Sequence, residues 1–261
     1  MKKIIWMTNI APAAICSILL LAGCGKKEAP EEQPASSPAA TSAPATPIDP
    51  ATAATVSGTV KFEGVAPKAA AIDMSQDPNC KGSNKAEVVV ASDGHLANVF
   101  VYVKEGLGNR TFAAPKDAVE LDQTGCRYHP HVMGVMAGQT IKIVNSDPTT
   151  HNIHPSPSPA GGNREWNESQ APQTAPLEKS FARDEVMLPV KCNQHPWMKM
   201  YINVVKSPFY AVSGPDGKYE LKGLPPGDYT LAFVHEKLGE QVQKVTLAAK
   251  DSKTVDVSFK Q

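Results

Sequence analysis

The stretch VMLPVKCNQHPWMKMYINVV, residues 186–205, decides how this chain folds. It begins and ends with runs of strand length and strand composition, Val186 to Val190 and Tyr201 to Val205. The loop between them is short and contains Pro196. We therefore predict a hairpin whose end can bring several side chains together at one point.

Similar short runs, separated by Gly, Pro, Asn and Asp, continue in both directions from this hairpin. No window shows a sustained apolar period of 3.6 residues. The pattern predicts an all-β protein, a sandwich or a barrel. The expected strands outside the hairpin are Thr59–Phe62, Glu87–Val90, Val99–Val103, Thr140–Val144, Lys218–Lys222, Tyr229–His235, Val242–Leu247 and Thr254–Phe259.

Residues 1–24 have the composition of a targeting segment. Lys2 and Lys3 precede a mainly apolar stretch, which ends in Leu21-Ala22-Gly23-Cys24. This ending resembles the bacterial lipobox, which implies a lipoprotein signal peptide and lipidation of Cys24. The alternative is a short membrane anchor with an incidental cysteine. Lipidation would anchor the protein in the bacterial cell envelope, facing the periplasm. Because Gly25 is not acidic, we expect the outer membrane rather than the inner.

The segment 25–55 is rich in Pro, Ala, Ser and Thr and has almost no large apolar residue, so it predicts a disordered tether. The remainder divides into an expected main domain, 56–208, and a C-terminal segment, 209–261. Lys plus Arg and Asp plus Glu both number 26, and the charges are interspersed. Without a basic stripe, nothing indicates a nucleic-acid partner.

Residues of metal-ligand type gather in three stretches: 145–154, 192–198 and, more weakly, 128–131. In the second, Cys192, His195 and Met198 stand three residues apart within the hairpin loop. Thiolate, imidazole and thioether are donors that suit copper in both oxidation states. A second imidazole would come from the first stretch, where His151 follows an expected strand.

The loop Cys192-x-x-His195-Pro196-x-Met198 and the upstream His151-Asn152-Ile153-His154 resemble the type 1 copper proteins, or cupredoxins, in the short-loop form of amicyanins. The resemblance covers roughly residues 56–207 and implies a cupredoxin-like Greek-key β-sandwich. It implies one copper ion with His151, Cys192 and His195 as equatorial ligands and Met198 as the axial ligand. It also implies that Asn152 braces the ligand segment against the Cys loop. Pro196, which has no N–H, cannot donate a hydrogen bond to the sulfur.

Several alternatives stay open at this point. His154 can replace His151, and Met200 can replace Met198. Zinc also binds Cys and His, although a Met ligand argues against it. His129 and His131 can form a second metal site, but we favour a surface turn beside Cys126.

The assignment of Cys192 as a ligand also determines what we expect of the other cysteines. Cys16 is lost with the signal peptide, Cys24 is lipidated and Cys192 binds metal. Cys80 and Cys126 are then free to form a disulfide in an oxidising compartment. The alternative is two buried free thiols.

The C-terminal segment has its own resemblance. The stretches Asp216-Gly217-Lys218-Tyr219-Glu220-Leu221 and 223–231 are similar to the carboxypeptidase regulatory-like family. This implies a small transthyretin-like β-sandwich. Because the segment is short for that family, we expect it to use strands from earlier in the chain, such as Gly58 to Phe62.

The cupredoxin resemblance implies an electron carrier rather than an enzyme. His195 would present an exposed imidazole edge as the electron port. Pro196 and Trp197 would form an apolar collar for a transient redox protein partner. One alternative is copper storage or delivery, and another is a structural or binding lipoprotein without metal.

Overall fold

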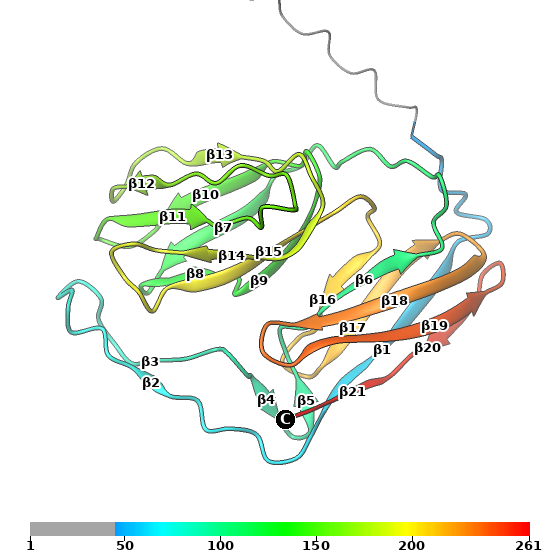
Figure 1. The fold of residues 1–261 in the computed structure, drawn as a ribbon, viewed down its shortest axis with the longest axis horizontal. Coiled ribbons are helices and arrows are strands. Elements are labelled where there is room, and N and C mark those ends of the chain that lie inside the picture. The colour runs from blue at the N-terminus through cyan, green and yellow to red at the C-terminus, as the bar shows by residue number, and fades with distance from the viewer. Residues whose placement is uncertain (1–44) are drawn as a thin grey trace, which may run out of the picture. The chain divides into compact units, whose positions relative to one another are not determined.

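Strands form all the regular structure of residues 45–261, the part of the chain that this computed structural model describes (Figure 1). The predicted signal peptide, its lipidation site Cys24 and the tether up to residue 44 lie outside the described residues. Among the described residues, no helix is long and apolar enough to cross a membrane. The prediction of an all-β, Greek-key sandwich is confirmed.

The first sandwich consists of two sheets, with strand orders β13-β10-β7-β8 and β12-β11-β14-β15-β9. Alternate residues of both sheets face inward and enclose a core that includes Leu121, Ile143, Ile153, Leu188 and Ile202. The predicted runs at 140–144, 186–190 and 201–205 are confirmed as strands. The strands are β7 (Val119–Thr124), β8 (Arg127–His129), β9 (Val132–Met136), β10 (Ile141–Asn145), β11 (His151–Pro155), β12 (Glu168–Gln170), β13 (Leu177–Lys179), β14 (Glu185–Lys191) and β15 (Lys199–Val205).

A second core lies between two other sheets, one of which contains β1, drawn in blue in Figure 1, and the other β6 in green and β18 in orange. One sheet has the order β17-β1-β5-β4, with β20 and β21 also paired to β1, and the other has the order β16-β6-β18-β19. The strands are β1 (Ala54–Glu63), β4 (Ala91–Ser92), β5 (His95–Leu96), β6 (Phe100–Glu105), β16 (Tyr210–Val212), β17 (Lys218–Leu224), β18 (Gly227–His235), β19 (Gly239–Leu247), β20 (Ser252–Thr254) and β21 (Val257–Lys260). A separate pair joins β2 (Ala71–Ile72) to β3 (Asn84–Lys85).

The first and last parts of the chain share this second core. β1 pairs antiparallel with β17, where Val56 stands opposite Leu221, and parallel with β20 and β21. Strand pairing therefore crosses the predicted boundary at residue 208, and β1 supplies the extra strand that the short C-terminal segment required. Gly58 permits this arrangement, because a Cβ there would collide with the backbone carbonyl of Val255.

Two strand predictions differ from the structure. Glu87–Val90 forms no strand, and its Val88 is 43% exposed. The run Thr254–Phe259 is interrupted at 255–256, between β20 and β21. The interruption has a local cause: the Asp256 carboxylate accepts the backbone N–H of Thr59 at 2.9 Å and bonds Lys61 Nζ at 2.8 Å.

The two sandwiches contact each other through a third, smaller apolar cluster. It contains Phe100 from β6, Val132 from β9 and Val205 from β15, with Tyr210 packed against it. Gly134 in β9 allows the close approach, because a Cβ there would lie 2.5 Å from ring carbons of Tyr210.

The predicted disulfide between Cys80 and Cys126 is confirmed. Cys126 follows β7, whereas Cys80 belongs to the long connection between β1 and β4, coloured cyan in Figure 1. The disulfide therefore fixes part of this connection to the first sandwich.

Candidate metal centre

The hairpin predicted from residues 186–205 forms as β14 and β15, with Cys192 directly after β14. The Cys192 N–H donates to the carbonyl of Met198 at 3.2 Å, and the Met198 N–H donates to the carbonyl of His195 at 2.9 Å. These two bonds close the loop. His151 reaches the same place from the first position of β11.

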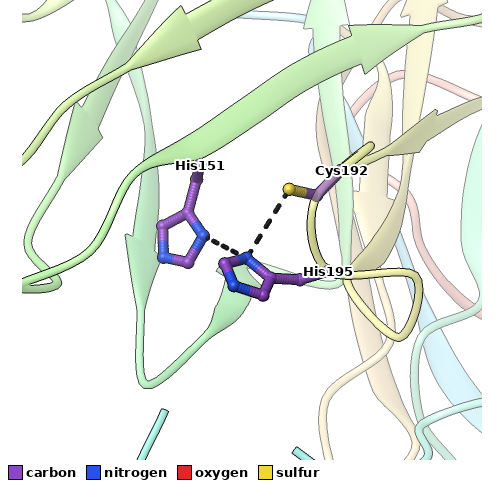
Figure 2. Close-up of side chains that lie close together, drawn as sticks. All are labelled: His151, Cys192 and His195. Carbon is purple, nitrogen blue, oxygen red and sulfur yellow. Dashed lines mark hydrogen bonds between the residues drawn. The ribbon is translucent and has the colours of Figure 1, made fainter. Parts of the chain in front are cut away.

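Figure 2 shows that the side chains of His151, Cys192 and His195 point toward one another. Nδ1 of His151 lies 2.8 Å from Nδ1 of His195, which lies 3.8 Å from Sγ of Cys192. One ligand atom from each residue lies within 4.8 Å of the others. His151 is fully buried, and Cys192 and His195 are each 3% exposed. Two imidazoles and one sulfur thus converge in a site shielded from water.

The outer nitrogen of each imidazole is bonded to a carboxylate. His151 Nε2 lies 2.8 Å from Oδ2 of Asp147, and His195 Nε2 lies 3.1 Å from Oδ2 of Asp77. These bonds fix both ring orientations and leave each Nδ1 directed into the cluster. Such outer partners orient imidazole ligands and make them more basic.

The sulfur of Cys192 is prepared as a thiolate. Burial raises the pKa of Cys192, but the bond with His151 and backbone N–H groups outweigh burial and lower the pKa from 9.0 to about 6. One of these donors is the backbone N–H of Asn152, 3.3 Å from Sγ. Asn152 therefore joins the two segments through its main chain, while its side chain bonds Asn167 at 3.2 Å.

The pKa of His151 shifts in the opposite direction to that of the thiol. Burial lowers the pKa of His151, yet the bonds to Asp147 and Cys192 raise it from 6.5 to about 8. Burial also raises the pKa of Asp147, but the bond from His151 and two backbone amides lower it overall. The pKa of Asp77 is lowered to about 2, first by the hydroxyl of Thr149 and then by the amide of Asn79. The centre is thus a coupled set of anions and imidazoles.

His154, the alternative to His151, bonds away from the cluster. Its Nδ1 lies 2.8 Å from Asn193 Oδ1, and its Nε2 lies 2.6 Å from Glu165 Oε1. Met198 and Met200 are both buried in the first core. Of the two, Met198 has the backbone that pairs with Cys192 across the closed loop.

Two further groups of ligand-type residues overlap this cluster: Asp77 with Cys80 and His195, and Cys126 with Asp147 and His151. In both groups the cysteine belongs to the disulfide, so it offers no thiolate. Their carboxylates serve instead as the outer partners of the two histidines.

The histidines of the third stretch lie apart from this cluster. His129 is exposed, as the surface-turn interpretation expects. His131 is buried, which that interpretation did not expect. Its Nδ1 lies 3.2 Å from the carbonyl of Lys199 and its Nε2 lies 2.5 Å from Glu236 Oε1. Both ring nitrogens are therefore engaged.

The prediction of an exposed imidazole edge at His195 is wrong. Only 3% of His195 is exposed, and Asp77 covers its Nε2. Neither Asp77 nor Asp147 was predicted from the sequence as part of this site. Asp147 could have been found, because it stands four residues before His151 inside the ligand-rich stretch. Asp77 is 118 residues from His195 and carried no local signal.

The chain matches no family model and no curated protein. Parts of it are similar to solved structures. A copper-containing nitrite reductase from Thermus scotoductus is 19% identical over 38% of this chain and 24% of its own, with a TM-score of 0.32. An oxidised proline-to-alanine mutant of amicyanin is 20% identical over 33% and 81%, with a TM-score of 0.30. A purple cupredoxin from Nitrosopumilus maritimus is 21% identical over 34% and 99%, with a TM-score of 0.28. The match spans 24% of the nitrite reductase chain. TM-scores of 0.28 to 0.32 are too low for these similarities to indicate a function.

Proposed function

We propose that this chain binds one copper ion in a type 1 site and carries single electrons. His151, Cys192 and His195 would be the equatorial ligands, and Met198 the axial one. The observation that carries the proposal is the convergence of two imidazole Nδ1 atoms and one sulfur, from two separate segments, in a buried cluster. A Cys with two His residues and a weak axial Met is the donor set of electron-transfer copper sites.

Copper suits these donors better than zinc does. Hydrogen bonds lower the pKa of Cys192 and so favour its thiolate form even without metal. Zinc accepts Cys and His, but it has little use for a thioether. The buried Met198 at the closed end of the loop therefore favours copper.

The surroundings of the cluster favour a carrier over a protein that releases its metal. Each imidazole is fixed by a carboxylate, and the sulfur receives the backbone N–H of Asn152. Ligand side chains that are held in position before the metal binds move little when the charge of the metal changes. They also do not separate easily to release it. Copper bound here would supply the one-electron couple.

The first test is to add Cu(II) to the purified full chain and record its visible spectrum, with the Cys192→Ser and His154→Gln variants alongside. We expect an intense thiolate-to-copper band in the wild type. Cys192→Ser should abolish it, and His154→Gln should leave it, because His154 bonds away from the cluster. A wild-type chain without the band would contradict a type 1 site.

A second measurement separates a carrier from a delivery protein. A carrier gives a reversible reduction potential and retains its copper in the presence of a copper-free acceptor. Rapid transfer of copper to that acceptor, without a reversible potential, would favour delivery instead.

Cellular placement and partner are part of the same proposal. A lipid on Cys24 would hold the protein at the bacterial envelope, facing the periplasm, where a redox protein would dock briefly through a small interface. Fractionation of cells carrying Cys24→Ala tests the anchor. The variant should leave the membrane fraction, and its retention there would contradict lipidation.

A further inference from the structure

The segment 73–80 belongs to the connection between β1 and β4, yet it lies against the metal centre of the other sandwich. Its Asp77 contacts the cluster directly. Oδ2 of Asp77 lies 3.1 Å from His195 Nε2 and accepts the hydroxyl of Thr149 at 2.7 Å. The other oxygen, Oδ1, accepts the backbone N–H of Asn79 at 2.8 Å. One carboxylate therefore joins this segment to both ligand-bearing stretches of the centre.

The same segment is fixed at its end by the disulfide from Cys80 to Cys126. The backbone N–H of Cys126 donates to Asp147 Oδ2 at 2.7 Å, and this oxygen also bonds His151. The carbonyl of Cys126 accepts the indole N–H of Trp197 at 3.1 Å. The disulfide thus connects segment 73–80 to the hydrogen-bond network that orients both imidazoles.

We propose that Asp77 is a positioning residue of the metal centre, and that segment 73–80 closes the outer edge of His195 against direct docking by a partner. This inference rests on the proposed copper site for its effect on the metal. The covering role itself is a property of the metal-free chain. Without the carboxylate, the His195 ring loses the partner that fixes its orientation, and the segment loses its side-chain hydrogen bonds to Thr149 and His195.

Asp73 offers a matched control in the same segment. Its Oδ1 accepts the backbone N–H of Ser75 at 3.0 Å, in the same local turn that Asp77 makes with Asn79. Asp73 makes no bond to the metal centre in the residues described. Asp73→Ala therefore removes an equivalent turn contact and leaves the centre alone, whereas Asp77→Asn keeps an oxygen that can accept from Thr149 and His195.

The covering role is tested in the metal-free, disulfide-intact full chain by the rate at which iodoacetamide modifies Cys192, located by peptide mapping. Asp77→Ala should react several-fold faster than the wild type. Asp73→Ala should match the wild type, and Asp77→Asn should lie near it. Equal rates in Asp77→Ala and Asp73→Ala would overturn the covering role.

The positioning role is tested with copper. Removal of an outer partner of a ligand imidazole reduces metal affinity by about 10- to 100-fold. We expect this loss in Asp77→Ala relative to Asp73→Ala, together with a higher reduction potential, because a less basic imidazole stabilises Cu(II) less. An unchanged affinity and potential would overturn the positioning role. If the wild type gives no thiolate-to-copper band, the proposed function fails, while the alkylation comparison still decides whether the segment covers the site.

Discussion

The two cores of this protein differ in what they bury. The second core, between the sheets of β1 and β18, is made almost entirely of apolar side chains such as Val56, Leu231 and Phe233. The first sandwich buries His151, His195 and Asp147 beside an apolar core, together with a network of amides. Buried polar groups cost free energy unless they are fully hydrogen-bonded. The comparison indicates that the second core mainly stabilises the fold, whereas the first sandwich loses some stability because it buries the polar groups that fix a site.

A network of amides satisfies most of the buried polar groups near His151, although the buried Oε1 of Gln123 has no partner among the described residues. Gln170 stands opposite His151 in the β11–β12 pair. Its Oε1 accepts from Gln123 Nε2 at 2.7 Å, and its Nε2 donates to the carbonyl of Ile143 at 3.1 Å. Asn145 donates to the carbonyls of Gln170 and Thr149, both at 2.9 Å. These bonds connect β7, β10 and β12 to one another, and Asn145 joins the loop that leads into His151 to this network.

Two buried histidines make the same contrast. His151 has a carboxylate partner, and its pKa is raised to about 8. Burial lowers the pKa of His235, whose Nδ1 accepts the backbone N–H groups of Lys237 and Leu238 at 3.1 and 3.3 Å. An accepting nitrogen carries no proton, so the His235 ring is neutral, and its buried Nε2 has no hydrogen-bond partner among the described residues. Burial alone therefore does not distinguish His151 from His235, whereas their hydrogen-bond partners do.

The largest loss of stability is expected from Phe233→Ala in the second core, and it tests whether the two cores are independent. Loss of a buried Phe side chain costs about 3–5 kcal/mol of stability. The thiolate-to-copper band of the folded variant should remain unchanged, because Phe233 belongs to the other core. Urea unfolding gives the stability, and the visible spectrum reports the centre. Loss of the band from the folded variant would show that the two regions are not independent.

A smaller loss of stability is expected from Gln170→Leu in the first sandwich. The substitution leaves Gln123 and the carbonyl of Ile143 without their Gln170 bonds, at a cost of about 1–3 kcal/mol. Unlike Phe233→Ala, it should also weaken copper binding, since it alters the strand partner of His151. Copper titration and unfolding of the same sample measure both. Reduced stability with unchanged copper affinity would show that the network supports the fold alone.

The smallest change is expected in the pH dependence of the metal-free protein. Cys192 has its pKa lowered from 9.0 to about 6, so its contribution to stability is complete above pH 9 and is lost as the pH falls through 6. His151 has its pKa raised from 6.5 to about 8, so its contribution is complete below pH 6.5 and is lost as the pH rises through 8. Between pH 6.5 and 8 the two contributions have opposite slopes, and the free energy of unfolding should stay nearly flat.

The rate of alkylation reports the ionisation of Cys192 alone, which the free energy of unfolding does not separate from that of His151. The rate at which iodoacetamide modifies Cys192 in the metal-free wild type should rise through about pH 6. An ordinary rise near pH 9 would contradict the lowered pKa of the thiol.

The sequence by itself determined most of the strands and the core of the candidate site. Alternation of side chains and the closing of a short hairpin are local properties, so residues 186–205 predicted β14, β15 and the loop that carries Cys192, His195 and Met198. The cysteine assignment also predicted the disulfide. An earlier strand such as Gly58 to Phe62 was expected to complete the C-terminal sheet, but only the tertiary structure decided that β1 pairs with β17, β20 and β21, and that Asp77 covers His195. Both contacts join residues more than a hundred positions apart, and such pairings depend on how the cores pack rather than on any local pattern.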